Sequence, residues 1–483
     1  MRLDQVLPGA APAGARGLQI STLAYDNRLV QPGTLFFCVP GFTRDGHDFA
    51  PDAVARGAVA LVVERPLALN VPQILVESVR AAMAPAAAAL YGDPTSRLQT
   101  VGVTGTNGKT TSAFLVRALL EAGGRSTGLL GTVKSVIGGV EHDVERTTPE
   151  AIDLQRTFRT MVDAGDQACV MEVSSHALEL RRADAIHFAA AVFTNLTQDH
   201  LDFHPTMEDY FNAKRLLFCG AEPPRASVVN ADDPYGARLA SDLDGSITFA
   251  LRADADYRVT DVQTDLDGSR FSVDTPHDGR LALHSPLRGQ FNVYNVLGAL
   301  ATARVLEVPV GTCVQAIATA GQVPGRFETV DEGQSFAVLV DYAHTPDSLE
   351  NVLRAARRLT DVRLHVVFGC GGDRDRGKRP LMGGIARRLA DRVIVTSDNP
   401  RSEDPEAIIA EILEGSGRDV IHDADRHAAI ALAIADAGPG DVVVIAGKGH
   451  EQGQEFAGGR KIPFDDGTVA REILRGDPVG AVS

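Results

Sequence analysis

A glycine-rich segment at residues 104–111 constrains the fold of this 483-residue chain more than any other stretch. A short β-branched run precedes it at residues 100–103, and an amphipathic helical pattern follows it and stops at residues 123–124. A strand, a glycine loop and a helix in this order cradle a phosphate chain, because backbone N–H groups and the helix N-terminus face the anion. Lys109 would add a positive charge and Thr110 a hydroxyl for Mg²⁺. The segment therefore predicts a nucleotide-phosphate site in an α/β fold.

The segment matches the common phosphate-loop pattern only in part. A strict pattern would have glycine at position 103, where this chain has Val103, so the match is to a shorter variant. The structural alternative is a glycine-rich turn that only packs. We expect the nucleotide contacts to come from Gly105, Thr106, Asn107, Gly108, Lys109, Thr110 and Thr111.

Length and composition restrict the class of protein. A chain of this length is expected to form about three domains. The net charge is −16 and there is no Trp, so nucleic acid is not expected as a partner. The five cysteines lie far apart, which is typical of reduced intracellular thiols. Neither a signal peptide nor an apolar run of membrane-spanning length is recognisable, so we expect a cytoplasmic protein that does not bind a membrane.

Alternating strand and helix patterns predict an α/β protein of three domains, with a mostly parallel central sheet covered by helices on both faces. The predicted domains are residues 1–97, 98–325 and 326–483, and the last is a Rossmann-like α/β domain. In the first domain we expect strands at residues 35–39, 58–63 and 74–76 and a helix at residues 80–91. In the central domain we expect strands at residues 169–173, 190–194 and 227–230 and a helix at residues 297–305.

The stretch at residues 248–287 alternates polar and apolar side chains between Asp/Gly turns, which predicts antiparallel strands added to the central sheet. In the third domain we expect strands at residues 337–340, 364–368, 393–396 and 442–446. Ligands of open α/β sheets bind at the carboxyl ends of the strands. The loops that follow these strands are therefore the places to search for a site.

Two segments after central strands carry candidate metal ligands. Glu172 ends one strand, where a carboxylate would serve as an Mg²⁺ ligand in the same sheet as the phosphate loop. The alternative at this strand end is a helix N-cap by Ser174 or Ser175. His200 and His204 stand four residues apart after the next strand, but no further Cys or His at zinc-site spacing accompanies them.

Lys214 lies in an aromatic and aliphatic helical segment at residues 210–218. The default interpretation is a solvated surface lysine. Burial among such neighbours would instead lower its pKa and open the amine to covalent modification.

In the third domain, residues 369–379 form a glycine-rich loop dense in cations. Such a loop suits an anionic substrate, with the guanidinium of Arg374 or Arg379 paired to a carboxylate or phosphate. A solvated charge run is the alternative. Cys370 has no adjacent base in the sequence, so we do not assign it as a nucleophile.

Two further loops of this domain carry groups for an amino acid. Asp398 and Asn399 would receive an ammonium group and Arg401 a carboxylate, with an Asx turn before Pro400 as the modest alternative. Residues 447–451 directly follow the last predicted strand, at residues 442–446, and likewise place polar groups at its carboxyl end. The residues alone therefore indicate a P-loop enzyme of ATP-driven ligation or phosphoryl transfer.

The motifs together are more specific than any one of them, and their order resembles that of the Mur ligase family. They are Gly105–Thr111, Met171-Glu-Val-Ser-Ser-His176, Thr194-Asn-Leu with Asp199-His200, Asn292-x-x-Asn295, Asp341-Tyr-Ala-His-Thr-Pro346 and Asp398-Asn-Pro-Arg401. The resemblance extends over all three predicted domains. It implies ATP-dependent ligation of meso-2,6-diaminopimelate to the D-glutamyl residue of UDP-N-acetylmuramoyl-L-alanyl-D-glutamate through an acyl phosphate, a step of peptidoglycan precursor synthesis.

The resemblance also implies roles for individual residues, with ATP and Mg²⁺ as the cofactors. The catalytic set would be Lys109, Glu172, His200 and Lys214, and the metal ligands would be Thr110, Glu172, His200 and Lys214 as a carbamate. Around the nucleotide would lie Asn292, Asn295, Arg326 and Asp341. The UDP-muramoyl substrate would contact Asn27, Phe42, Thr43, Thr147, Thr148, Ser174 and Arg182. The amino acid would contact Arg374, Asp398, Asn399, Pro400, Arg401, Gly447 and Glu451.

Two other functions stay open at this point. A folylpolyglutamate synthase-like ligase shares the phosphate loop, but it normally lacks such an N-terminal unit and the Asp-Asn-Pro-Arg stretch. A non-enzymatic ATP-binding regulatory module would not need the catalytic set of four residues. We further expect a monomer, and closure of the third domain onto the central one when ATP and substrate bind.

Overall fold

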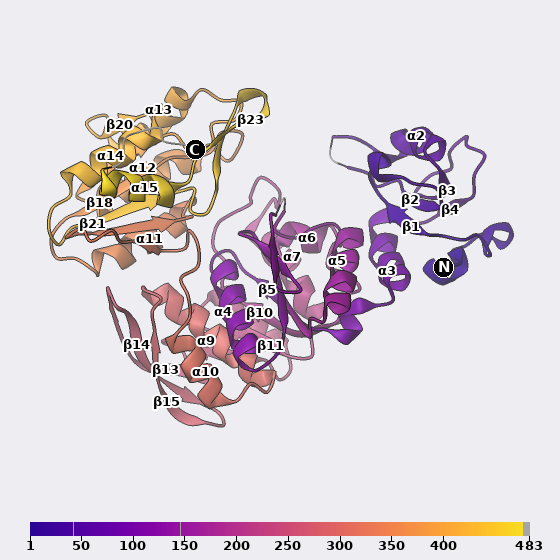
Figure 1. Cartoon of the computed structure of the whole chain (residues 1–483), viewed down its shortest axis with the longest axis horizontal. Helices are drawn as coiled ribbons and strands as arrows, with labels where there is room; N and C mark the ends of the chain where they lie inside the picture. Colours follow the sequence, from indigo (N-terminus) through magenta and orange to yellow (C-terminus); the bar gives the residue numbers. More distant parts are fainter. Residues whose placement is uncertain (42, 145, 477–483) are drawn as a thin grey trace. The chain divides into compact units, whose positions relative to one another are not determined.

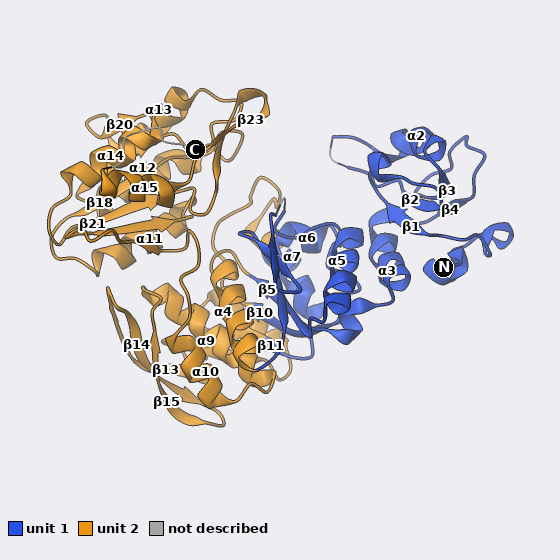
Figure 2. Cartoon of the chain, in the orientation of Figure 1, with its two compact units in different colours: residues 1–104, 124–192, 211–227 blue, residues 105–123, 193–210, 228–483 orange. Residues whose placement is uncertain are grey.

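The computed structural model describes residues 1–41, 43–144 and 146–476 (Figure 1). Their packing forms two compact units, coloured separately in Figure 2. Unit 1 comprises residues 1–104, 124–192 and 211–227, and unit 2 comprises residues 105–123, 193–210 and 228–483. The three domain boundaries expected from the sequence stay a prediction. Within the described ranges, no helix combines the length and the apolar character that crossing a membrane requires.

Unit 1 begins with a parallel four-stranded sheet in the order β1-β2-β3-β4, namely β1 (Thr22–Ala24), β2 (Thr34–Phe37), β3 (Ala58–Val63) and β4 (Gln73–Leu75). Successive side chains of a strand point to opposite faces. One face packs against α2 (Ala50–Ala55), and the other against α1 (Leu3–Val6) and α3 (Val79–Tyr91). The predictions of β2, β3, β4 and α3 are confirmed, whereas β1, α1 and α2 were missed because they are too short for a clear period.

The rest of unit 1 holds strands in the order β10-β5-β9-β6-β7-β8. They are β5 (Gln99–Thr104), β6 (Thr127–Leu130), β7 (Ser135–Ile137), β8 (Val140–His142), β9 (Ala168–Glu172) and β10 (Phe188–Phe193, all but its last residue). Strands β5 and β6 pair in parallel with β9, and β7 and β8 continue the sheet antiparallel. The helices are α5 (Ala151–Ala164), α6 (Ser175–Glu179) and most of α7 (Met207–Cys219).

Unit 2 contains α4 (Lys109–Ala122), β11 (Ser227–Asn230, all but its first residue), α8 (Pro234–Asp242), β12 (Ile247–Ala250), β13 (Tyr257–Asp265), β14 (Gly268–Thr275), β15 (Gly279–Ser285), α9 (Gln290–Val305) and α10 (Val310–Ala318). Strands β13, β14 and β15 are antiparallel, as expected. The prediction was wrong for β12, which pairs in parallel with both β11 and β13. The chain after β12 turns around the carboxylate of Asp232, which accepts backbone N–H bonds from Leu251, Arg252 and Ala253.

The last part of unit 2 is a six-stranded sheet in the order β16-β17-β21-β18-β19-β20, parallel except for β16. The strands are β16 (Glu328–Val330), β17 (Ala337–Asp341), β18 (Leu364–Phe368), β19 (Arg392–Thr396), β20 (Ile421–Asp423) and β21 (Val442–Ala446). One face packs against α11 (Pro346–Arg357), α12 (Lys378–Leu389) and α13 (Pro405–Ser416), and the other against α14 (Arg426–Asp436) and α15 (Asp466–Arg475). A separate hairpin consists of β22 (Gly453–Phe456) and β23 (Arg460–Pro463). The α/β class with helices on both faces is thus confirmed.

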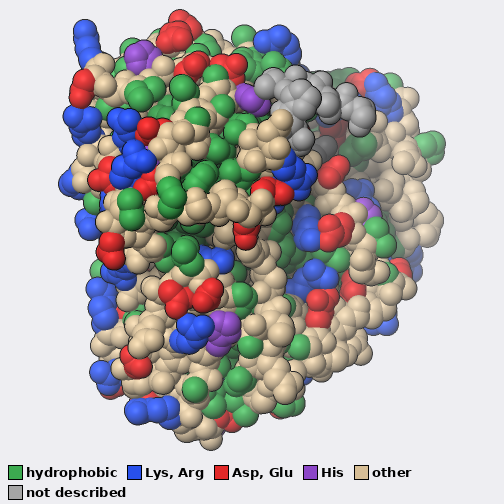
Figure 3. Space-filling view, turned by 60° about the vertical axis from the view of Figure 1, so that its left-hand side comes forward, with side chains coloured by type: hydrophobic (Ala, Val, Ile, Leu, Met, Phe, Trp, Pro, Cys, Tyr) green, Lys and Arg blue, Asp and Glu red, His purple; other side chains and the backbone are tan. Residues whose placement is uncertain are grey.

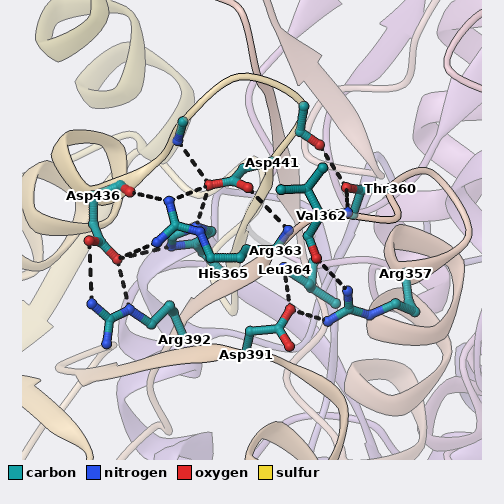
Figure 4. A network of polar contacts seen from close by, with 12 residues as sticks. Arg357, Thr360, Val362, Arg363, Leu364, His365, Asp391, Arg392, Asp436 and Asp441 are labelled. Carbon is teal, nitrogen blue, oxygen red and sulfur yellow. Dashed lines mark hydrogen bonds and ion pairs between the residues drawn. The ribbon is translucent and has the colours of Figure 1, made fainter.

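A polar network fixes the amino ends of three of these strands (Figure 4). Asp441, just before β21, accepts the backbone N–H of Arg363 at 3.1 Å and contacts Nε2 of the buried His365 at 3.0 Å. Asp391, just before β19, accepts the backbone N–H of Leu364 at 2.7 Å. Burial raises the pKa of Asp441, but the N–H donors around it outweigh this effect and lower its pKa to about 2. The network lies at the edge of the sheet opposite the carboxyl ends, so we assign it a structural role.

Acidic and basic side chains are intermixed over the face drawn in Figure 3. Charged side chains of the described residues also form exposed pairs, such as Arg392 with Asp436 at 2.8 Å. Exposed pairs of this kind contribute at most about 1 kcal/mol each, because water screens them. The packed faces of the sheets, rather than the surface charges, therefore hold the fold together.

Candidate active site

The phosphate loop follows β5, and two of its glycines are required by its shape. Gly105 has φ +150° and Gly108 has φ +83°, values that favour glycine. A Cβ atom at Gly105 would collide with Oγ1 of Thr194, and one at Gly108 with Oδ1 of Asn295. Helix α4 begins at Lys109 and ends before Gly123, as the sequence predicts. The strand, loop and helix geometry of an anion site is therefore present.

The loop is held by Asn195, a residue that sequence reasoning did not assign to the site. The backbone N–H of Thr106 donates to the Asn195 carbonyl and that of Asn107 to Asn195 Oδ1, both at 2.9 Å. The ammonium of Lys109 donates to the carbonyls of Gly105 at 2.9 Å and Thr106 at 2.8 Å. Because the N–H groups of Thr106 and Asn107 already serve the loop, the N-terminal end of α4 is the main source of donors for an anion.

Arg326 reaches the same loop from the segment before β16. Its Nη2 donates to Oγ1 of Thr110 at 3.1 Å, and its guanidinium carbon lies 4.5 Å from the ring centre of Tyr342. Asp341, at the end of β17, accepts the backbone N–H of Phe327 at 2.7 Å. Burial raises the pKa of Asp341 to about 6, against the opposing effect of Arg326. The structure thus brings Arg326 to the loop and makes Asp341 a support for the adjoining segment.

Asn292 and Asn295 form a buried polar support for the loop. Nδ2 of Asn295 donates to Oδ1 of Asn292 at 2.9 Å, and Oγ of Ser112 in α4 donates to Oδ1 of Asn295 at 3.3 Å. Both asparagines are less than a tenth exposed. Since Asn295 also lies against Gly108, these side chains hold the position of the loop relative to α9.

The segment after β10 carries the two predicted histidines. The backbone N–H of His200 donates to Oδ1 of Asp199 at 2.8 Å, and its φ of +54° marks a constrained turn. Burial raises the pKa of Asp199, but His200, His344 and Lys109 outweigh it, and the pKa lies below its usual value. His204 is buried, with its ring 5.2 Å from that of Tyr210. No cluster of three or more metal-ligating His, Cys, Asp or Glu side chains occurs in the described part of the chain.

Asp347, in the first turn of α11, is a site residue that sequence reasoning missed. Its Oδ2 accepts bonds from Nδ2 of Asn107 at 2.9 Å, Oγ1 of Thr197 at 3.0 Å and Nδ2 of Asn351 at 3.1 Å. Burial raises its pKa. The carboxylate therefore joins the phosphate loop, the segment after β10 and α11.

Replacing Asp347 with alanine removes the acceptor shared by Asn107 and Thr197. Each such bond contributes about 0.5–3 kcal/mol, so we expect the KM for ATP to rise about tenfold or more. Steady-state kinetics with varied ATP will measure it. Asp361→Ala, at an exposed position after α11, is the matched control and should leave this KM unchanged. An unchanged KM in Asp347→Ala would contradict the assigned role.

In unit 1, Glu172 lies at the end of β9 and is 1% exposed. Its Oε1 accepts the backbone N–H of Thr132 at 2.8 Å, and its Oε2 accepts the hydroxyl of the same residue at 3.1 Å. The Thr132 hydroxyl also lies 3.1 Å from that of Thr147. Oγ1 of Thr148 donates to the Glu172 carbonyl at 2.9 Å. The Glu172 carboxylate thus accepts two bonds from Thr132, in a cluster that also contains the hydroxyls of Thr147 and Thr148.

Ser174 and Arg182 join this cluster. The backbone N–H of Ser174 donates to Oγ1 of Thr148 at 3.2 Å, and Nη1 of Arg182 donates to the Thr148 carbonyl at 3.2 Å. Arg182 also pairs with the buried Glu150 at 2.9 Å. Ser174 is the N-cap of α6, accepting the N–H of Ala177, so the alternative proposed for this strand end is confirmed as a local role. Of the predicted residues, the structure therefore brings Thr147, Thr148, Glu172, Ser174 and Arg182 together.

The remaining predicted residues of unit 1 differ in their setting. Lys214, in α7, is 1% exposed, so the default interpretation of a solvated lysine was wrong. The residue lies on the inward face of a helix whose neighbours Tyr210 and Phe211 are also buried. Asn27 donates to Oδ2 of Asp52 at 2.7 Å, and Thr43 is exposed. Phe42 lies outside the described residues.

The loops after β19 and β21 meet in the last part of unit 2. Asp398, Asn399 and Pro400 are buried, and Nδ2 of Asn399 donates to Oε2 of Glu451 at 2.7 Å. Gly447, with φ +118°, allows close approach, since a Cβ atom there would lie 2.5 Å from Oδ2 of Asp398. The structure therefore places these predicted contacts in one cluster at the carboxyl ends of the strands.

Arg401 adjoins this cluster. Its Nε pairs with Oε2 of Glu455 at 3.1 Å, and its Nη1 donates to the carbonyl of Gly372 at 2.8 Å. Of the two arginines considered in the neighbouring loop, Arg379 is fully buried and bonded to Glu403 and Glu411, whereas Arg374 is exposed. The suggestion that Arg379 binds substrate was wrong, because its guanidinium is engaged within the protein. These pairs hold the shape of the loop that carries Arg374.

A buried ion pair, also missed from the sequence, anchors the two loops. Arg426 and Asp466 are both fully buried and bonded twice, each time at 2.7 Å. Nη1 of Arg426 donates to the Ser397 carbonyl at 3.2 Å and Nη2 to the Ala446 carbonyl at 3.0 Å. Because these carbonyls lie at the ends of β19 and β21, the pair fixes where both loops begin.

Replacing Asp466 with alanine leaves the Arg426 charge buried without its carboxylate. Breaking such a pair typically costs about 3–5 kcal/mol, so we expect the free energy of unfolding of the region around the six-stranded sheet to fall by this amount. Urea unfolding followed by circular dichroism will measure it. Glu472→Ala, at an exposed position of the same helix, should change the free energy by about 0.5 kcal/mol or less. A loss of less than about 1 kcal/mol in Asp466→Ala would contradict the anchoring role.

Comparison with known proteins places these features in context. Residues 103–303 match the sequence model of the Mur ligase middle domain, residues 325–449 that of the Mur ligase glutamate ligase domain, and residues 19–91 that of the Mur ligase family catalytic domain. The chain is 48% identical to the UDP-N-acetylmuramoyl-L-alanyl-D-glutamate–2,6-diaminopimelate ligase of Geobacillus thermodenitrificans, over 97% of this chain and 98% of that protein. The corresponding protein of Synechococcus elongatus is 49% identical over 95% of each chain.

Solved structures give the same relationship. A structure of a UDP-N-acetylmuramoyl-L-alanyl-D-glutamate–2,6-diaminopimelate ligase is 32% identical, with a TM-score of 0.72 over 99% of both chains. MurF ligase from Thermotoga maritima, solved in complex with ADP, has a TM-score of 0.63 at 20% identity, over 89% of this chain and 94% of that one. At that identity the second likeness concerns the fold alone.

Proposed function

The chain belongs to the Mur ligase family, and from this premise we propose that it joins meso-2,6-diaminopimelate to the D-glutamyl residue of UDP-N-acetylmuramoyl-L-alanyl-D-glutamate, with ATP converted to ADP and phosphate. The observation that carries the proposal is the cluster of Asn399, Arg401 and Glu451 at the carboxyl ends of β19 and β21. It combines the carboxylate of Glu451, oriented by Asn399, as an acceptor for an ammonium group with the guanidinium of Arg401 for a carboxylate. This is the pair of groups that the far end of diaminopimelate presents.

The nucleotide end of the reaction rests on the phosphate loop. The N-terminal N–H groups of α4 and the ammonium of Lys109 would receive the phosphates of ATP. Arg326, already bonded to Thr110, would add a second positive charge next to them. These donors are fixed before ATP arrives, so little reorganisation would oppose the transfer of charge.

Two of the residues proposed for Mg²⁺ fit the ion directly in their chemistry. The hydroxyl of Thr110 and the carboxylate of Glu172 are the oxygen ligands that Mg²⁺ prefers. His200 and Lys214 would complete a second position, where the carbamate of the buried Lys214 would supply an anionic oxygen group. Bound there, the metal would neutralise phosphate charge during transfer.

The reaction would proceed in two steps. The γ-phosphoryl group of ATP passes to the D-glutamyl side-chain carboxylate, with ADP as the leaving group, and gives an acyl phosphate. The amine of diaminopimelate then attacks the acyl carbon, loses a proton, and phosphate leaves from the tetrahedral intermediate. Lys109 would hold the phosphoryl group in place, and the catalysis would consist mostly of positioning and charge stabilisation.

The UDP-muramoyl substrate would lie along unit 1. Thr147, Thr148, Ser174 and Arg182 would contact its muramoyl-dipeptide end, and Asn27, Phe42 and Thr43 its uridine end. Their clustering around Glu172 supports the first of these assignments. We further propose that the protein is a monomer in the cytoplasm. The third domain would close onto the central one when ligands bind.

Phosphate release from ATP tests the function. Release should require both the UDP-muramoyl dipeptide and diaminopimelate, and omission of either should reduce it to background. Release with a folate and glutamate instead would favour the folylpolyglutamate synthase-like alternative. No release with any of these substrate pairs would favour a regulatory ATP-binding module.

A further inference from the structure

A buried ammonium group contacts the amino-acid cluster. Lys448 follows β21, and its side chain is fully buried. Its Nζ donates to Oδ1 of Asn399 at 3.0 Å and to Oε2 of Glu451 at 2.9 Å, and it lies 4.0 Å from Oδ1 of Asp398. Burying a charge is costly unless partners compensate it. The lysine therefore has a specific role at this position rather than a place on a solvated surface.

The ammonium fixes the orientation of the Asn399 amide. Oδ1 of Asn399 accepts from Lys448 and from the backbone N–H of Glu455 at 3.0 Å, while Nδ2 donates to Glu451 at 2.7 Å. With two donors on the oxygen, the amide cannot turn over without losing both bonds. The side chain of Glu451 is 31% exposed, so it is the member of this group that a substrate can reach. Lys448 thus orders the groups that face the substrate without being exposed to it.

The ammonium also sets the charge of the cluster. Asp398 and Glu451 contribute two carboxylates, whereas Arg401 is balanced by Glu455, and Arg426 by Asp466. Among the side chains that it contacts, Lys448 therefore changes the summed formal charge from −2 to −1. A site of charge −2 would favour a more cationic amino acid, because attraction to its ammonium would outweigh the need for a second carboxylate.

We propose that Lys448 is a positioning residue for amino-acid selectivity: it orients Asn399 and Glu451 and lowers the negative charge, so that the site prefers diaminopimelate over L-lysine. This inference rests on the proposed function and deepens it. Lys448 does not touch the reacting atoms in this scheme, and it acts through the two side chains that it holds.

Lys448→Met tests the inference, because methionine keeps an unbranched apolar side chain and removes the charge. We expect the KM for diaminopimelate to rise about tenfold or more, and the ratio of kcat/KM for diaminopimelate over L-lysine to fall by a similar factor. The KM for ATP should stay within about twofold, since the phosphate loop is untouched. A merely structural role would lower the amount of active enzyme and leave the selectivity ratio unchanged. Lys134→Met, on the β6–β7 connection, is the matched control. Its KM for diaminopimelate, its selectivity ratio and its KM for ATP should all equal those of the parent.

Two outcomes separate this inference from the function on which it rests. If the parent enzyme releases no phosphate in response to diaminopimelate, both the proposed function and the inference are overturned. Active parent enzyme and a Lys448→Met variant of unchanged selectivity would overturn the inference alone. Should circular dichroism show that Lys448→Met does not fold, Lys448→Gln repeats the test, because glutamine keeps an N–H donor for Asn399. Because only the charge is then lost, a smaller fall in the selectivity ratio than for Lys448→Met is expected, and an unchanged ratio again overturns the inference.

Discussion

Lys109→Ala is expected to reduce phosphate release by about 10³-fold or more in kcat. The ammonium lies over the loop and donates to the carbonyls of Gly105 and Thr106. Removing it takes away the charge that would stabilise the transferring phosphoryl group, and loss of a single such donor typically costs about 10²–10³-fold. The additional loss reflects the full charge of the ammonium and its place at the centre of the loop.

The measurement is single-turnover phosphate release at saturating substrates, with the thermal unfolding of the variant recorded in parallel. Lys134→Ala serves as the control for the loss of a lysine elsewhere, and its rate should equal that of the parent. The unfolding midpoint of Lys109→Ala should stay within a few degrees, because water can take over the bonds to the two carbonyls. A folded variant that keeps more than about a tenth of the parent rate would contradict the assignment of the loop as the ATP site.

Arg401→Ala is expected to raise the KM for diaminopimelate about 30–100-fold. A charge-assisted bond between a guanidinium and a carboxylate is worth about 2–3 kcal/mol, and each 1.4 kcal/mol corresponds to about tenfold in affinity. The KM for ATP should not change, because Arg401 lies in the loop after β19 and not at the phosphate loop. Selectivity over L-lysine should fall, since lysine lacks the carboxylate that Arg401 would hold.

Because Arg401 also bonds Glu455 and the Gly372 carbonyl, its loss could loosen the loop. Arg401→Lys addresses this point by keeping the charge without the two-pronged geometry, and its KM should lie between those of the parent and the alanine variant. Arg418→Ala, at an exposed position, is the control. If the parent and Arg401→Ala showed equal selectivity, the claim that Arg401 selects diaminopimelate through its second carboxylate would be contradicted.

The parts of the site that the sequence predicted are those encoded locally. The loop at residues 104–111 is recognisable because the shape-determining glycines, the lysine and the threonines follow one another directly. The strand ends carrying Glu172, Asp398 and Glu451 were found because buried strands have a clear apolar pattern and polar residues follow them. For such features, residues that are neighbours along the chain are also neighbours in the site, so the sequence alone predicts their arrangement.

The missed features depend on partners far apart in the chain. Asp347 and Asn107 are 240 residues apart, Lys448 and Asn399 are 49 apart, and Arg426 and Asp466 are 40 apart. Nothing in the local pattern around these residues distinguishes a buried pair from solvated charges. The burial of Lys214 escaped prediction for a related reason, because apolar residues surround it in the sequence without indicating which face of α7 turns inward.

The fold was predicted where elements are long and periodic. Strands β18, β19 and β21 and helix α3 fall close to their expected bounds. The parallel pairing of β12 was missed because it depends on the turn around Asp232, which alternation of side chains does not reveal. Helix α9 begins at Gln290, seven residues before the expected start at 297. Its first residues were missed because the helix is buried on nearly all sides and therefore shows no alternation of a polar and an apolar face.

Oxygen transfer tests the central claim most directly. The UDP-muramoyl dipeptide is labelled with ¹⁸O in the D-glutamyl side-chain carboxylate and incubated with ATP, diaminopimelate and the enzyme. If the γ-phosphoryl group passes to that carboxylate, the inorganic phosphate released carries one ¹⁸O atom from it, and the tripeptide product retains the other in its new amide. Phosphate without the label, or a labelled dipeptide that does not react with diaminopimelate, would contradict the account.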